Sequence, residues 1–116
     1  MSSEFPERSR FTASLNPFTL PAARRQEIAR DTFARFLDIK TAAAELRADP
    51  RLSADECTLM DEVVTMCDVA LSDLMVYAEA RDPDTLTDDH FAQVMLRVET
   101  ADALEDNLAL LRRDLF

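Results

Sequence analysis

Glycine is missing from this chain of 116 residues, and its absence argues against several architectures. Hairpins, β-bulges and tight loops use backbone conformations with positive φ, which glycine adopts at the lowest cost. Phosphate-binding loops of the P-loop and dinucleotide types also require glycine. The good helix formers Ala, Leu, Arg and Glu are abundant instead. The composition therefore predicts an all-α protein.

Histidine and cysteine are scarce, which limits the chemistry open to the chain. The one histidine is His90, and no sequence signal supplies it with a nucleophile or an orienting acid. Cys57 and Cys67 would lie about 15 Å apart on one helix, too far for a disulfide. Two cysteines and one histidine serve zinc poorly, and the Glu-x-x-His pairs of a di-iron bundle are missing. We expect a protein that is not an enzyme and has no cofactor or metal site.

Long hydrophobic runs are also missing. No apolar run approaches the ~20 residues that a membrane span needs. Glu4 and Glu7 stand near the start of the chain, where a signal peptide would have an apolar core. We therefore expect a cytoplasmic protein that does not insert into membranes.

Residues 1–20 have no sustained periodicity, and Pro6 and Pro17 interrupt any helix there. They are expected to form an irregular tail. Scattered phenylalanines in this segment suggest that it either straps across the rest of the chain or docks on a partner, because such side chains are costly to leave in water.

Apolar residues recur at steps of three and four in the rest of the chain, 21–116, which is typical of amphipathic helices. Ser53 and Glu56 form a capping-box sequence, and Thr87 is the expected cap of the last helix. The widest apolar face belongs to the second helix, which is therefore expected to lie in the middle. Short connections predict an up-down-up bundle of three long antiparallel helices. Its predicted helices cover about 21–48, 53–81 and 87–115.

Negative charge gathers in the second part of the chain. Residues 1–51 hold nine bases and seven acids, whereas residues 52–116 hold four bases and sixteen acids. The two parts carry net charges of +2 and −12, which together give the chain its −10. Phosphates would repel such a chain, so we expect no direct binding of nucleic acid.

Eight acids of the second and third helices have no base three or four residues away, where a helix would bring an ion-pair partner. These candidate acids are Asp61, Glu62, Asp68, Asp73, Glu99, Asp102, Glu105 and Asp106. Three interpretations are open: a solvated face, ion pairs with arginines of the first helix or of a second subunit, or a recognition surface for a basic partner. The first helix differs, because its spacing predicts internal pairs such as Asp31 with Arg35.

The recognition surface leads to a functional hypothesis. A small acidic helical protein without a catalytic motif suits binding and inhibition of a basic protein, such as a nucleic-acid-binding enzyme or a toxin. Bacterial or phage inhibitors, immunity proteins, anti-CRISPR proteins and DNA mimics are often small and acidic, which is an analogy of size and composition alone. The alternative is a homodimeric scaffold, adaptor or secretion chaperone, which the wide apolar face of the second helix favours.

Overall fold

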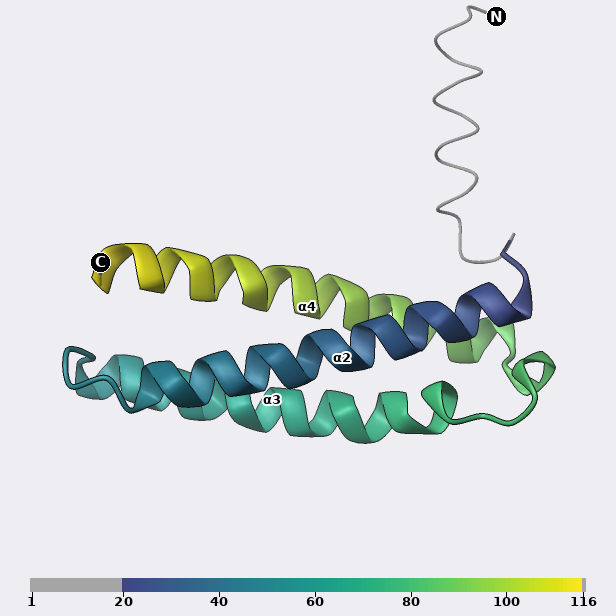
Figure 1. Ribbon diagram of the computed structural model, residues 1–116, viewed down its shortest axis with the longest axis horizontal. Helices are drawn as coiled ribbons and strands as arrows, with labels where there is room; N and C mark the ends of the chain where they lie inside the picture. Colours follow the sequence, from purple (N-terminus) through teal and green to yellow (C-terminus); the bar gives the residue numbers. More distant parts are fainter. Residues whose placement is uncertain (1–19, 116) are drawn as a thin grey trace, which may run out of the picture.

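A computed structural model describes residues 20–115 of the chain (Figure 1). The helices are α2 (Ala22–Arg47), α3 (Ala54–Ala78) and α4 (Asp88–Leu115), and one turn of 3-10 helix, η2 (Pro83–Thr85), lies between α3 and α4. This range contains no strand, which confirms the prediction of an all-α protein with three helices packed as a bundle. The predicted tail lies outside the described residues except for Leu20.

Local capping explains where α3 and α4 begin. Ser53 Oγ accepts from the Glu56 N–H at 3.1 Å, and the Ser53 N–H donates to Glu56 Oε1 at 2.8 Å, so the predicted capping box is present. Thr87 Oγ1 accepts from the His90 N–H at 3.2 Å, as expected for a cap. Among the described residues no side chain caps the start of α2, where Pro21 occupies the N-cap position.

The end of α3 depends on side chains from α2. Gln26 Nε2 donates to the carbonyl of Ala80 at 2.5 Å, and Arg30 Nε donates to the carbonyl of Ala78 at 2.9 Å. These donors satisfy carbonyls that a longer helix would have bonded internally. As a result α3 ends at Ala78, three residues before the predicted end at position 81.

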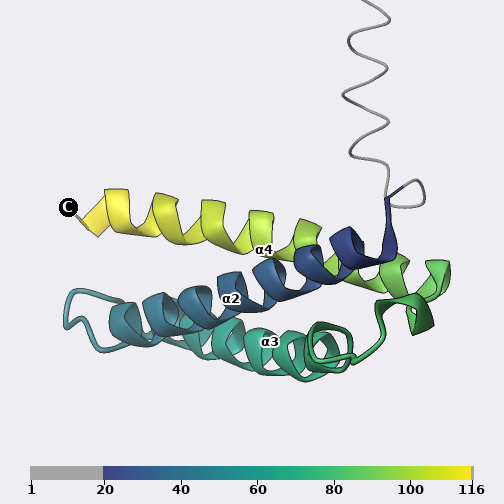
Figure 2. The ribbon, with the colours of Figure 1, turned by 45° about the vertical axis from the view of Figure 1, so that its right-hand side comes forward.

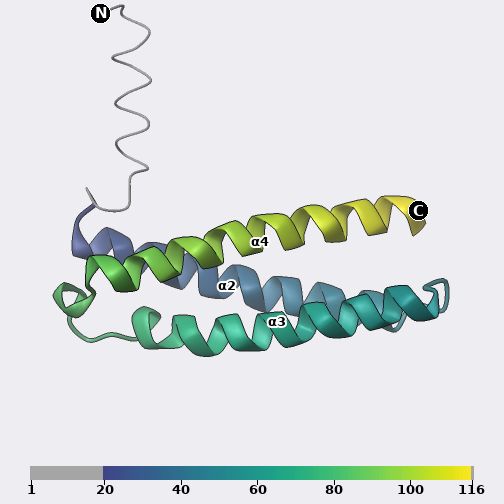
Figure 3. The same ribbon diagram turned by 180° about the vertical axis from the view of Figure 1, so that it is seen from behind.

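The helix in the middle is α2, so the expectation that the second helix would occupy that place is wrong. Figures 1 and 2 show α3 and α4 on opposite sides of α2. α2 packs most extensively against α3, less against α4, and α3 and α4 touch each other little. Figure 3, seen from behind, shows α3 and α4 with α2 lying between and behind them.

Charge accounts for this order. α2 carries six bases and four acids, a net charge of +2, whereas α3 carries six acids and no base, a net charge of −6. α4 carries three bases and seven acids, a net charge of −4. Placing α3 in the middle would have packed two acidic helices along their length. The observed order instead places the helix with a positive net charge between the two acidic ones.

The core follows the predicted apolar periodicity. The largest fully buried side chains are Phe36, Phe91, Met60, Leu74 and Val94. The seam of α4 that steps by three and four is buried at most of its positions, as expected. The wide apolar face of α3 is buried only in part. Ala70 is fully buried, whereas Leu59, Met66 and Val76 have exposed fractions of 49%, 44% and 69%.

Candidate partner-binding site

Five of the eight candidate acids lie in ion pairs between helices. On α3, Asp61 lies 3.0 Å from Arg47 Nε and Asp68 lies 2.6 Å from Lys40 Nζ. Both of these bases belong to α2. The ion-pair interpretation named arginines of the first helix; Asp68 pairs with a lysine of that helix instead, and Asp73 pairs with Arg97 of α4. The five acids are Asp61, Asp68, Asp73, Asp102 and Glu105.

Arg35 holds two of these acids at once. Its Nη2 lies 2.5 Å from Asp102 Oδ1 and 2.6 Å from Glu105 Oε1, and its Nε donates to Glu105 at 3.0 Å. The hydrogen bonds that Arg35 donates to Glu105 raise the pKa of Arg35 above its ordinary value; burial opposes this effect, and the bond to Asp102 adds to it. The acids of one turn of α4 are thus anchored to the middle helix.

The partners of the α2 arginines differ from those that sequence spacing predicted. Arg35 was expected to pair with Asp31 inside the same helix, but its guanidinium reaches Glu105 of α4 instead. Arg30 also reaches another helix, since its Nε donates to the carbonyl of Ala78 in α3. The sequence contained one signal of these contacts between helices: α2 has more bases than acids, whereas the other two helices are rich in acids.

The remaining three candidate acids are Glu62, Glu99 and Asp106. Among the described residues none of them forms an ion pair, and all three are exposed. The structure therefore divides the candidate acids into two groups. Five have their charge countered by a neighbouring helix, and three present it to the surroundings.

An apolar groove runs between α3 and α4, where the two helices diverge. We call it the α3–α4 groove; its volume is about 480 Å³. Its walls come from one stretch of each helix, residues 56–66 and 100–111. The lining residues are Glu56, Leu59, Met60, Glu62, Val63, Met66, Thr100, Ala103, Leu104, Asn107, Leu108 and Leu111.

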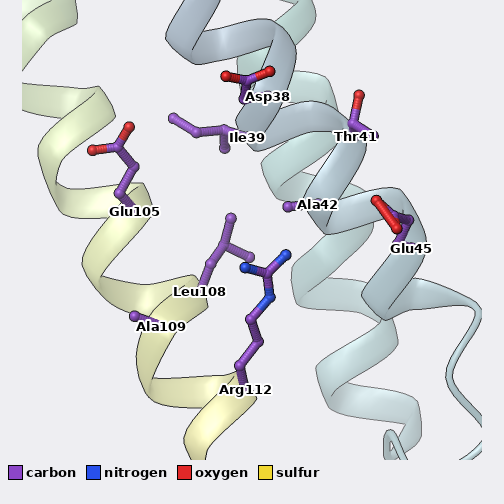
Figure 4. Close-up of a pocket in the computed structure, with 9 residues that line it drawn as sticks. All are labelled: Asp38, Ile39, Thr41, Ala42, Glu45, Glu105, Leu108, Ala109 and Arg112. Atoms are coloured by element: carbon purple, nitrogen blue, oxygen red, sulfur yellow. The ribbon is translucent and has the colours of Figure 1, made fainter.

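A second hollow lies between α2 and α4 and has a different character (Figure 4). Its volume is about 420 Å³, and Ile39 and Leu108 contribute apolar surface. Charged side chains of both signs surround it, among them Asp38, Glu45 and Arg112. This mixture of charges makes it a less selective site for a partner of one sign than the α3–α4 groove.

Polar side chains at the start of α4 and of η2 have structural roles. His90 is exposed, and its Nδ1 accepts from the Thr87 N–H at 3.3 Å, which completes the cap of α4. Asp82 accepts from the Asp84 N–H at 3.0 Å and begins η2. No group of three or more His, Cys, Asp or Glu in residues 20–115 is arranged to hold a metal ion.

Comparison of the chain with protein-family models, with curated proteins and with solved structures finds no match. None of the helices in the described part of the chain is both long and apolar enough to cross a membrane.

Proposed function

We propose that this protein binds a basic surface on another protein in the cytoplasm and thereby inhibits or neutralises that protein, without catalysing a reaction. The observation that carries the proposal is the separation of charge in the bundle. α3 has six acids and no base, and α2 counters only some of this charge. The candidate acids that have no ion pair with another described residue are Glu62, Glu99 and Asp106.

The physical basis of recognition is long-range attraction. A surface of one sign attracts a surface of the opposite sign, speeds their encounter and disfavours partners of like charge. An up-down-up bundle would hold α3 and α4 as a rigid pair of negative surfaces. The ion-paired acids also contribute, since their side chains remain 44–63% exposed and keep an accessible carboxylate.

Affinity capture from the source cells, followed by titration with the purified captured protein, tests this proposal. The variant Glu62→Gln, Glu99→Gln, Asp106→Asn should bind roughly tenfold more weakly, because three unpaired charges are removed. The control is Asp82→Asn, Asp84→Asn, which removes acids from the η2 connection. A partner that binds wild type and the triple variant equally, with no dependence on salt, would refute recognition through acids.

The alternative function is that of a homodimeric scaffold or adaptor. The exposed apolar residues of the α3–α4 groove favour it, because contiguous apolar surface is a common feature of subunit interfaces. Sedimentation equilibrium distinguishes the two functions. A dimer at micromolar concentration would support the scaffold, whereas a monomer that gains mass only with a basic protein supports the proposed function.

A further inference from the structure

The α3–α4 groove combines apolar walls with an acidic border. Leu59 and Met66 are half exposed on the α3 side, although both belong to a hydrophobic stripe. The opposite wall on α4 carries Ala103 and Leu111. These side chains are open to solvent because α3 and α4 touch each other little. A partner that covered them would remove apolar surface from water.

The described charges that line the groove are all of one sign. Within residues 20–115, the charged residues that line it are Glu56 and Glu62, and none is basic. Glu56 belongs to the capping box of α3, whereas Glu62 has no ion pair among the described residues. An occupant therefore meets an apolar floor with negative charge beside it.

An ion pair joins the two helices beyond one end of the groove. Arg97 of α4 donates to Asp73 of α3, two turns beyond Met66. The groove itself extends from residue 56 to 66 on α3 and from 100 to 111 on α4. Each wall is about 15 Å long, which equals three turns of a helix.

We propose that the α3–α4 groove binds an amphipathic, cationic α-helix presented by the partner protein. This inference rests on the proposed function and names the part of the partner that is recognised. A helix with apolar residues at spacings of i, i+3 or i+4, and i+7 would place three of them along the walls. Lysine or arginine on its flank would lie toward Glu62 and offset its charge.

A second copy of this chain fits the groove less well. A symmetric dimer brings the same surface patch of each subunit together. Glu62 of each subunit would then lie near the acidic border of the other subunit's groove. Like charges that meet across an interface are unfavourable. Charge complementarity therefore favours a cationic occupant over a second copy.

The experiment uses the full chain and a synthetic peptide of about 18 residues, or five helical turns. The peptide contains leucine and lysine, with the leucines on one helical face, and carries a fluorescent label. A second peptide has the same composition in an order that distributes leucine around the helix. We expect 1:1 binding of the first peptide and at least roughly tenfold weaker binding of the second, because both have the same charge but only one has an apolar face.

Matched variants locate the binding site. Leu59→Ser, Met66→Ser should weaken binding of the first peptide roughly tenfold or more. Leu37→Ser, Leu110→Ser is the control, since these leucines are similarly exposed, at 46% and 51%, and do not line the groove. Glu62→Gln should weaken binding roughly threefold at low salt and less at high salt. Thermal melts verify that all of these variants fold.

Three results would overturn the inference. The first is equal binding of the two peptides, or equal loss in the groove and control variants. The second is a dimer of the free chain that Leu59→Ser, Met66→Ser abolishes, which would assign the groove to a second copy. The third is hydrogen-exchange protection of residues 1–19 in the free chain that the same variant removes, which would assign it to that segment. Each of these results leaves the proposed function standing if the variant Glu62→Gln, Glu99→Gln, Asp106→Asn still binds the captured partner protein more weakly than wild type does.

Discussion

Arg35 of α2 and Glu105 of α4 are joined by two hydrogen bonds, from Nε at 3.0 Å and from Nη2 at 2.6 Å. They are 70 residues apart in the sequence. The Arg35 side chain is 30% exposed, so the pair lies at the edge of the α2–α4 interface. The same guanidinium contacts Asp102, so one cation joins α2 to two carboxylates of α4, in addition to the ion pair of Arg25 with Asp88 at 2.6 Å.

Removing this cation should destabilise the fold. Arg35→Met keeps most of the aliphatic stem and leaves two carboxylates without their base, so we expect a loss of about 1 kcal/mol in the free energy of unfolding. The control is Arg24→Met, because Arg24 pairs only with Glu27 in its own helix and should cost about 0.3 kcal/mol. Urea denaturation measures both losses. The Arg35 effect should shrink in 1 M salt, and equal effects of the two variants would contradict the assigned role.

The unpaired acids of α4 should behave in the opposite way. Glu99 and Asp106 each lie three or four residues from Asp102, so all three carboxylates repel one another on the helix surface. Glu99→Gln, Asp106→Asn should leave thermal stability unchanged or slightly raise it. Asp102→Asn, Glu105→Gln should lower it, because that change removes both partners of Arg35. Equal melting temperatures of the two double variants would show that the Arg35 ion pairs contribute nothing in solution.

The buried seam of α4 should be sensitive to truncation. Leu104 is 5% exposed, and Leu104→Ala should reduce the free energy of unfolding by about 2–5 kcal/mol, through lost burial and a cavity. Leu110→Ala makes the same chemical change at a residue that is 51% exposed, and should cost less than about 0.5 kcal/mol. Chemical denaturation gives both values. A small loss at Leu104 would mean that the seam is not packed against α2.

The capping box of α3 allows a test within one helix. Ser53→Ala removes the oxygen that accepts from the Glu56 N–H, and should cost about 1 kcal/mol. Ser72→Ala makes the same substitution at an exposed position inside α3. Alanine is the better helix former there, so the melting temperature should stay equal or rise slightly. Thermal denaturation followed by circular dichroism compares the two, and a reversed order would contradict the capping role.

Stability should depend on Cys67 at alkaline pH. Burial raises the pKa of the Cys67 thiol to about 11, from an ordinary value of 9.0; Asp68 adds to the shift and Lys40 opposes it. The pKa of this thiol is higher in the folded state than in the unfolded state. The stability that depends on the neutral thiol is therefore complete below pH 9 and is lost as the pH rises toward 11. The stability difference between wild type and Cys67→Ala should therefore narrow over this interval. Parallel stability curves for the two proteins between pH 8 and 11 would contradict the shift.

Local features of the sequence were sufficient to predict the helices. The steps of three and four along α4 identify the face that contains Leu104 and Leu108, because the period of an α-helix is the same wherever the helix packs. Ser53 and Glu56 marked the start of α3, since both bonds of a capping box lie within four residues. The identity of the eight candidate acids also followed from sequence spacing alone.

The tertiary structure decided how these helices meet and which acids remain unpaired. Arg35 has Asp31 and Asp38 within reach along its own helix, yet it bonds Asp102 and Glu105, because packing brings α4 beside it. Gln26 ends α3 from another helix in the same way. Such contacts depend on which elements become neighbours. The wide apolar face of α3 indicated contact on two sides, but α3 touches α4 little, and that side is open as the α3–α4 groove.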